Sequence, residues 1–146
     1  MKKQIKNQMK LEFDSISENE SFARVAVAAF LTQANPTLEE VADVKTAVSE
    51  AVTNAIIHGY EGAVHTVTIE ARLDDQVLEL EVSDTGVGIP DVEKAMEPMY
   101  TTKPELERSG MGFLFMEAFM DQIQVHSKPG EGTRVWMQKR LGKRTE

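Results

Sequence analysis

The first third of the chain is dominated by hydrophobic residues that recur with the period of a helix. Before it, residues 9–15 alternate between apolar and polar side chains, which predicts a short strand. A helix should then run from about residue 18 to residue 34, since Ser17 and Glu20 form a capping-box pattern at its start and Pro36 follows its end. The residues expected on its inner side are Phe22, Val25, Ala29 and Phe30.

A second helical segment begins at Thr37, which forms another capping-box pattern with Glu40, and it continues to about His58 and Gly59. Its apolar residues keep to one side of a 3.6-residue period, so this side should be buried against a core. The positions that define the apolar side are Leu38, Val41, Val44, Val48, Val52, Ala55 and Ile56.

Beyond residue 60 the hydrophobic pattern changes to a period of two, which predicts strands. The alternating segments form two antiparallel hairpins, and a helix over residues 112–121 lies between them. The four strand segments are residues 65–73, 77–82, 123–127 and 133–137. Strands and helices in this order predict one α+β domain over residues 1–146, a two-layer sandwich of a mixed, mostly antiparallel sheet with helices on one face.

Composition narrows the class of protein. The chain has 146 residues and 41% hydrophobic residues, enough for one core, and it has no cysteine, so disulfides and thiolate metal sites are excluded. No segment approaches the roughly 18 apolar residues of a membrane span, and the basic N-terminus is not followed by the apolar run of a signal peptide. We therefore expect a cytoplasmic protein that does not bind membranes.

Charge is distributed unevenly along the chain. Four basic side chains lie in residues 1–10 and four more in residues 139–146. Between residues 11 and 138 there are 8 basic and 23 acidic side chains, a balance of −15. Such a field repels phosphates and argues against direct nucleic acid binding. It either keeps the protein soluble or attracts a partner with a basic surface.

Three polar residues lie beside the apolar side of the second helix. At about 100° per residue, Glu50, Asn54 and His58 fall together along its flank. Taken alone, a glutamate and an asparagine at this spacing also fit a solvated helix edge. His58 and His65 have no suitably spaced carboxylate between them, so they do not indicate a zinc site.

Two glycine motifs add evidence for a ligand site. Asp84 directly follows a predicted strand and can accept a hydrogen bond from an exocyclic amine, while Gly86 and Gly88 allow a close backbone approach that a Cβ would block. The SGMGF stretch at residues 109–113 precedes a helix, whose free amides favour an anion. Each motif alone also fits a tight turn or a helix start, and neither is a Walker loop or a dinucleotide fingerprint.

The four motifs taken in order indicate a family more specifically than any one of them does alone. It consists of ExxxN on a helix, DxGxGIP after a strand, GxG at a helix start, and GEGT at residues 130–133 before the last strand. This set resembles the N, G1, G2 and G3 boxes of the GHKL ATPase and kinase superfamily over roughly residues 45–137. Within that superfamily, SENESFARV, EAVTNAIIHGY, DTGVGIP and TTKPELERSGMGF are similar to the anti-sigma-factor serine kinases of spore-forming bacteria, and this similarity spans nearly the whole chain.

The resemblance implies a Bergerat-type fold that binds ATP and Mg²⁺. In it, Asn54 would hold Mg²⁺, Glu50 would be the general base that accepts a proton from the attacking hydroxyl, and Asp84 would read the adenine amine with support from Thr133. Gly86 and Gly88 would leave room for the adenine ring beside Asp84. The other residues assigned to the nucleotide are Thr101, Thr102 and Lys103 in a lid of about residues 95–110, and Ser109, Gly110, Met111, Gly112 and Phe113 near the phosphates.

The same resemblance implies partners. It points to an anti-sigma factor that inhibits a sporulation sigma factor of the sigma F type and phosphorylates a serine of an anti-anti-sigma antagonist, acting as a homodimer. Arg24 on the first helix would contact these partners, although a lone arginine there also fits a solvated face.

Two alternatives stay open. One is a stress-response serine kinase that controls another sigma factor, and the other is a nucleotide-gated binding module without kinase activity, in which Glu50 would have no task. The ATP-binding half of a histidine kinase is disfavoured, because residues 1–36 contain no histidine that could accept a phosphoryl group.

Overall fold

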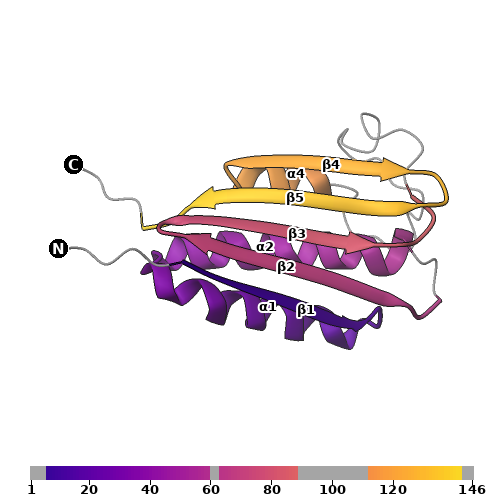
Figure 1. Ribbon diagram of the computed structural model, residues 1–146, viewed down its shortest axis with the longest axis horizontal. Helices are drawn as coiled ribbons and strands as arrows, with labels where there is room; N and C mark the ends of the chain where they lie inside the picture. The colour runs from indigo at the N-terminus through magenta and orange to yellow at the C-terminus, as the bar shows by residue number, and fades with distance from the viewer. Residues whose placement is uncertain (1–5, 60–62, 89–111, 143–146) are drawn as a thin grey trace.

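The fold comes from a computed structural model, in which the structure describes residues 6–59, 63–88 and 112–142. Within these ranges, strands form one layer and helices cover one face of the sheet (Figure 1). The strands are β1 (Lys6–Asp14), β2 (Thr66–Asp74), β3 (Val77–Asp84), β4 (Gln122–Lys128) and β5 (Gly132–Arg140). The helices are α1 (Glu18–Leu31), α2 (Leu38–Asn54) and α4 (Gly112–Phe119), with a 3₁₀ turn η1 (Thr32–Ala34) after α1 and a π-helical turn η2 (Ala55–Gly59) after α2.

The strand order in the described sheet is β1-β2-β3-β5-β4, and every neighbouring pair is antiparallel. Both predicted hairpins are present, as β2–β3 and β4–β5. Asp75 turns the first hairpin with φ 58°, a left-handed conformation that Asp adopts more readily than most residues. The predicted α+β class is therefore confirmed, and no parallel pair of a mixed sheet occurs among the described strands.

The core lies between the sheet and the helices. Alternate residues of β2 face it, and the outward residues between them are exposed or half-buried, as a sheet covered on one side requires. The fully buried side chains with the largest volumes come from both layers: Leu31, Val44, Val48, Val52, Ile69, Leu73, Leu78, Leu80, Met116 and Met137. On the predicted apolar side, Val44, Val48, Val52 and Ala55 are buried, and Val41 and Ile56 are partly buried against the core. The prediction is wrong for Leu38, which is 90% exposed at the first position of the helix.

The two predicted capping boxes have different outcomes. At Thr37 the prediction is confirmed, because the Thr37 hydroxyl accepts the Glu40 amide at 3.1 Å and Glu40 Oε1 accepts the Thr37 amide at 2.8 Å. At Ser17 it is wrong. Ser17 is itself helical, with φ −54° and ψ −36°, so its side chain makes no capping hydrogen bond.

The predicted inner side of α1 is wrong for three of its four residues. Phe22 and Val25 are 52% and 58% exposed, Ala29 is also exposed, and only Phe30 is buried. The buried residues of this segment are instead Ala23, Val27, Phe30, Leu31 and Ala34. Because apolar residues surround α1 on most sides, periodicity alone does not select a face. The small Ala23 is completely buried, and α1 packs against α2.

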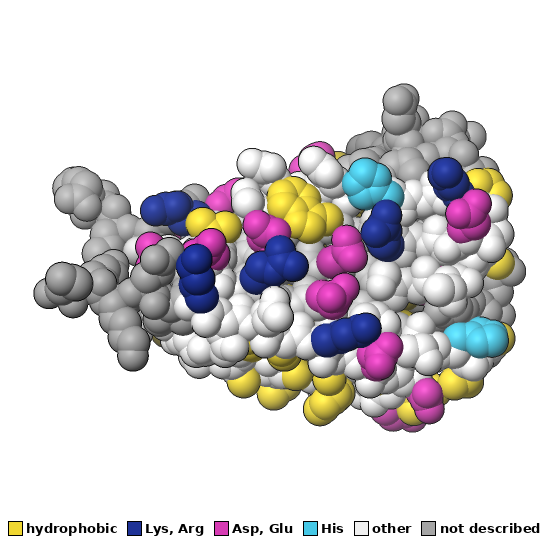
Figure 2. Space-filling model, viewed as in Figure 1, with side chains coloured by type: hydrophobic (Ala, Val, Ile, Leu, Met, Phe, Trp, Pro, Cys, Tyr) yellow, Lys and Arg dark blue, Asp and Glu magenta, His cyan; other side chains and the backbone are white. Residues whose placement is uncertain are grey.

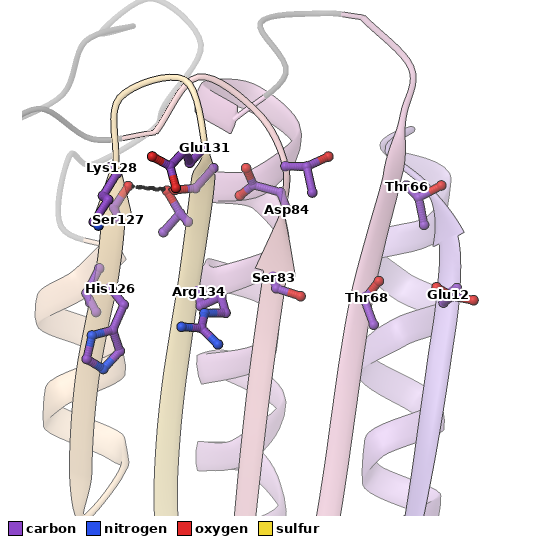
Figure 3. Close-up of a pocket in the computed structure, with 14 residues that line it drawn as sticks. Glu12, Thr66, Thr68, Ser83, Asp84, His126, Ser127, Lys128, Glu131 and Arg134 are labelled. Atoms are coloured by element: carbon purple, nitrogen blue, oxygen red, sulfur yellow. Dashed lines mark hydrogen bonds between the residues drawn. The ribbon is translucent and has the colours of Figure 1, made fainter.

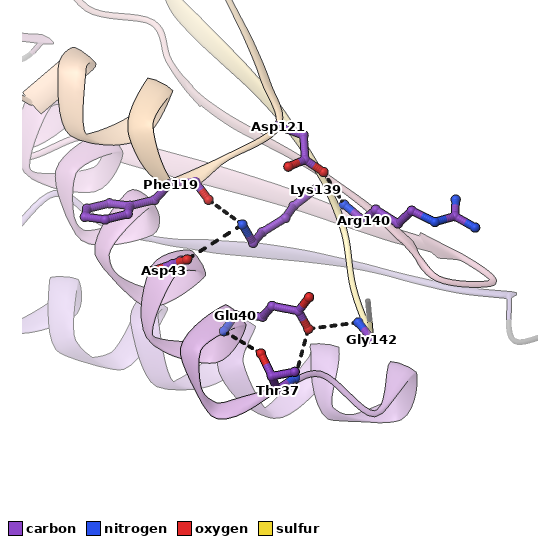
Figure 4. A network of polar contacts seen from close by, with 8 residues as sticks. All are labelled: Thr37, Glu40, Asp43, Phe119, Asp121, Lys139, Arg140 and Gly142. Carbon is purple, nitrogen blue, oxygen red and sulfur yellow. Dashed lines mark hydrogen bonds and ion pairs between the residues drawn. The ribbon is translucent and has the colours of Figure 1, made fainter. Parts of the chain in front are cut away.

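Polar contacts join the end of β5 to α2 and α4 (Figure 4). Glu40 Oε1 accepts the amide of Gly142 at 2.8 Å, in addition to its contact with Thr37. The nearly buried Lys139 donates to the carbonyl of Phe119 at 2.7 Å, and its Nζ lies 3.8 Å from Asp43 Oδ2. The C-terminal end of α4 and the first turns of α2 are therefore tied to the same strand.

The opposite face of the sheet is not covered by the described helices. Basic and acidic side chains are interspersed on it, with few hydrophobic ones (Figure 2). Arg72 pairs with Glu79 at 3.9 Å, and the Trp136 indole donates to Glu79 at 3.4 Å. None of the helices in the described ranges is long and apolar enough to cross a bilayer.

Candidate functional site

The candidate site lies where β3 ends and β5 begins (Figure 3). Asp84 is the last residue of β3 and is paired in register with Thr133 of β5. Both are polar and almost buried, with 7% and 5% of their surface exposed. A hollow of about 800 Å³ lies at this end of the sheet and continues onto its open face. Its lining includes Asp84, Ser127, Gly132 and Thr133.

Asp84 is held by backbone donors. Its Oδ1 accepts the amide of Gly86 at 2.9 Å, and the amide of Thr133 also hydrogen-bonds to the carboxyl group. Burial raises the pKa of Asp84 above its ordinary value, and the two backbone hydrogen bonds oppose this without cancelling it. The fold therefore keeps a poorly solvated carboxyl group in place at a strand end, as expected for a group that binds a ligand donor.

Glycines bring the turn after β3 against the β4–β5 hairpin. Gly88 has φ +79°, and a Cβ added there would lie 2.1 Å from the carbonyl oxygen of Lys128. The amide of Gly130 donates to the carbonyl of Val87 at 2.7 Å. The predicted role of Gly88 in a close backbone approach thus has a physical basis in this contact, and no side chain could replace it without moving the backbone.

Two residues of this site were given no role of their own from the sequence, although Gly132 lies within the predicted GEGT motif. Gly132 has φ +89°, and a Cβ there would lie 2.1 Å from the carbonyl oxygen of Asp84. Ser127 Oγ is 2.8 Å from Thr133 Oγ1 across the hairpin. The predicted pairing of residues 123–127 with 133–137 could have pointed to Ser127, because it brings Ser127 beside Thr133. The contact of Gly132 depends on the β3–β5 pairing, which sequence periodicity does not reveal.

Glu50 and Asn54 lie one turn apart on α2 and both are half-buried. Buried residues of the same helix, Val48 and Val52 among them, fix it against the sheet. The π-helical turn η2 begins directly after Asn54 and packs against β3 and β5. π-Helical turns inside or at the end of α-helices are frequently found at functional sites. His58 belongs to η2, but its side chain lies outside the described structure.

Arg24 lies on α1 beside the exposed Phe22 and Val25. Its Nε is 3.5 Å from Glu20 Oε2 and forms no hydrogen bond in the part of the chain that is described. Glu20 Oε2 also accepts the hydroxyl of Ser49 at 2.5 Å. Since Ser49 precedes Glu50 on α2, the polar group around Arg24 is connected to the helix that carries the predicted base.

The other predicted site residues divide into two groups. Gly112 begins α4, and the ring of Phe113 is packed in the core, so Phe113 could reach a ligand through its backbone only. The remaining ones lie outside the described residues: Thr101, Thr102, Lys103, Ser109, Gly110 and Met111.

The described residues contain no cluster of three or more His, Asp or Glu side chains that could hold a metal by themselves. Asn54 nonetheless fits one kind of ion. A carboxamide oxygen is a hard, neutral ligand, and Mg²⁺ usually keeps several waters and binds few protein groups together with substrate phosphates. The residues present are therefore compatible with Mg²⁺ that arrives with a nucleotide.

Comparison with known proteins gives consistent results. Residues 16–139 match the family model of the histidine kinase-like ATPase domain. A protein named "Anti-sigma F factor" from Clostridium acetobutylicum is 60% identical over 137 residues, covering 94% of this chain and 96% of the relative. Another of the same name, from Oceanobacillus iheyensis, is 57% identical over 140 residues, covering 95% of this chain and 96% of the relative.

Solved structures of low sequence identity share the fold. The crystal structure of the RsbU and RsbW domains of Rv1364c from Mycobacterium tuberculosis matches with a TM-score of 0.69 at 19% identity, covering 96% of this chain and 34% of that one. A histidine kinase domain from Erythrobacter litoralis matches with a TM-score of 0.56 at 17% identity, covering 84% of this chain and 60% of that one. At these identities the matches support the fold alone.

Proposed function

Because the chain belongs to the histidine kinase-like ATPase family, we propose that it is an anti-sigma factor with serine kinase activity. In this proposal it binds and inhibits a sporulation sigma factor of the sigma F type. With ATP and Mg²⁺ it phosphorylates a serine of an anti-anti-sigma antagonist. The observation that carries the proposal is the 60% identity, over 94% of the chain, to a protein named anti-sigma F factor.

The nucleotide would bind with its base at the strand ends and its phosphates toward α2 and α4. Asp84 would accept a hydrogen bond from the adenine amine at its buried position, and Gly86 and Gly88 would present no side chain to the ring. Gly112 begins α4, so its backbone would face the phosphates. The predicted lid residues Thr101, Thr102 and Lys103, and Ser109, Gly110 and Met111 of the glycine motif, complete this assignment as proposals from sequence.

Glu50 and Asn54 would divide the chemistry between them. Asn54 would hold the Mg²⁺ that neutralises phosphate charge when ATP is bound. Glu50, one turn earlier on the same half-buried edge, would accept the proton of the attacking serine hydroxyl. General-base catalysis is typically worth about 10² to 10⁴ in rate, while positioning and electrostatics supply the rest of phosphoryl transfer.

Arg24 would contact the protein partners. The exposed Phe22 and Val25, three positions apart on α1, support this assignment because they would give a partner apolar surface to cover beside Arg24. We further propose that the protein acts as a cytoplasmic homodimer, which light scattering on the purified chain can test.

The decisive experiment compares the wild type with Glu50→Gln. Each protein is mixed with Mg-ATP and a candidate antagonist, and phosphoserine is measured along with ATP affinity. We expect Glu50→Gln to bind ATP within about threefold of the wild type and to lose at least a hundredfold in phosphorylation rate. Retained phosphorylation in the variant would refute the base assignment.

A pull-down from a spore-forming host separates the remaining candidate functions. With ATP and with ADP in parallel, the bait should retain a sigma factor of the sigma F type in at least one state. Recovery of a different sigma factor would favour the stress-response alternative. Sigma factor binding without any antagonist phosphorylation by the wild type would favour the non-catalytic binding module, and absence of any sigma factor would contradict the proposal.

A further inference from the structure

Two hydroxyl groups at the candidate site are hydrogen-bonded to each other across the β4–β5 hairpin (Figure 3). Each has a single proton to donate. Ser127 Oγ donates to the carbonyl of Gly132 at 3.0 Å. Either hydroxyl could donate across the 2.8 Å between the two oxygens; because the Ser127 proton is directed at the Gly132 carbonyl, we assign Thr133 as the donor. With its proton directed at Ser127, Thr133 Oγ1 has only lone pairs left for a ligand.

Thr133 is joined to Asp84 on its other side. The amide of Thr133 hydrogen-bonds to the Asp84 carboxyl group, and the two residues are paired in register. An ionised carboxylate is also an acceptor without a proton to give. Asp84, Thr133 and Ser127 thus form a row across three strands. In this row, Asp84 and Thr133 present hydrogen-bond acceptors to a ligand.

We propose that Ser127 is a specificity-determining residue of the nucleotide site. By accepting the hydrogen bond of the Thr133 hydroxyl, it leaves Asp84 and Thr133 as a pair of acceptors. This pair selects a purine with an amine over a purine with a carbonyl at the same position. Ser127 acts through Thr133 and is therefore a positioning residue. The inference rests on the proposed nucleotide function and deepens it.

The backbone ladder of the hairpin does not by itself require a hydroxyl at position 127. β4 and β5 are held by a continuous antiparallel ladder from Gln122–Gln138 to Lys128–Gly132, which uses backbone groups alone. Ser127 is half-buried on the side that faces the helices, where an apolar residue would be equally at home. Its hydroxyl is accounted for by two hydrogen bonds, one donated to the Gly132 carbonyl and one accepted from Thr133.

The experiment measures the dissociation constants of the full-length chain for ATP and for ITP, whose base has a carbonyl in place of the adenine amine. In Ser127→Ala the Thr133 hydroxyl can rotate and donate to that carbonyl. We expect the preference for ATP over ITP to fall by about threefold to tenfold, the effect of one neutral hydrogen bond. Ser127→Thr, which restores the hydroxyl, should recover the wild-type preference.

Ser83→Ala is the matched control. Ser83 is also a half-buried serine that lines the hollow, but it precedes Asp84 and so faces the opposite side of the sheet. It should leave the ATP to ITP ratio unchanged. An unchanged ratio in Ser127→Ala would overturn the inference, and so would an equal loss of affinity for both nucleotides, which would indicate a purely structural role. If the wild type bound neither nucleotide, the proposed function itself would fail.

Discussion

The backbone of Gly132 lies against the end of β3, so Gly132→Ala tests the geometry on which the site depends. Gly132 has φ +89°, and the added Cβ would lie 2.1 Å from the Asp84 carbonyl oxygen and 2.6 Å from Thr85 Cα. Both are backbone atoms, which cannot swing aside as the end of a side chain can. β3 and β5 would have to separate where Asp84 pairs with Thr133.

The expected loss of stability has two parts. A left-handed backbone conformation costs a residue with a Cβ about 1–2 kcal/mol. Forcing an extra carbon into a packed region costs about 1–3 kcal/mol more. We therefore expect Gly132→Ala to lower the free energy of unfolding by about 2–5 kcal/mol, which lowers the urea midpoint by about 1–2.5 M at an ordinary slope of about 2 kcal/mol per M.

Gly130→Ala separates the two parts. Gly130 has nearly the same φ, +80°, but nothing lies within 4 Å of a Cβ added there. It should lose only the conformational part, about 1–2 kcal/mol, and keep its nucleotide affinity, whereas Gly132→Ala should lose at least tenfold in affinity. Equal urea midpoints and equal affinities for the two variants would show that contact with Asp84 is not what requires glycine at position 132.

Three further predictions concern other parts of the molecule. Burial raises the pKa of Asp84 above 3.8, so the contribution of its carboxyl group to stability is present at low pH and is lost as pH rises through the folded-state pKa. The stability of Asp84→Asn relative to the wild type, measured by urea unfolding, should therefore increase as pH is raised from acidic to neutral. A difference that does not change with pH would contradict this. Lys139→Met removes the buried donor that holds the end of α4 and should cost about 1–3 kcal/mol, while Lys10→Met at an exposed strand position should change the urea midpoint little. Phe30→Ala should cost about 3–5 kcal/mol because the ring is buried, and Phe22→Ala, 52% exposed, less than about 1 kcal/mol; similar thermal midpoints for the two would argue against the orientation of α1.

The elements that sequence predicts well are those determined by nearby residues. The two hairpins and the capping box of α2 depend on contacts between residues close in the chain, and the structure contains all three. The position of Asp84 at the end of β3 follows from the same local pattern. For these features, periodicity and turn chemistry carry enough information.

What could not be predicted depends on contacts between distant segments. The predicted orientation of α1 is wrong because alanines and large apolar residues lie around most of that helix. Its buried side is determined by packing against distant segments, chiefly α2. The positive φ of Gly132 serves the contact with Asp84, 48 positions earlier. The buried Lys139 looks like part of a basic tail in the sequence, yet its Nζ contacts Asp43 and Phe119.

The contacts at the end of β5 bear on how the chain folds as it leaves the ribosome. Leu141 is almost completely buried, its amide and carbonyl bond to residue 76, and the amide of Gly142 bonds to Glu40. The last described residues thus pack and hydrogen-bond against the first turn of α2 and the β2–β3 turn. Since a domain generally folds as a unit, we expect the nascent chain to complete this packing only after residues 141 and 142 have emerged.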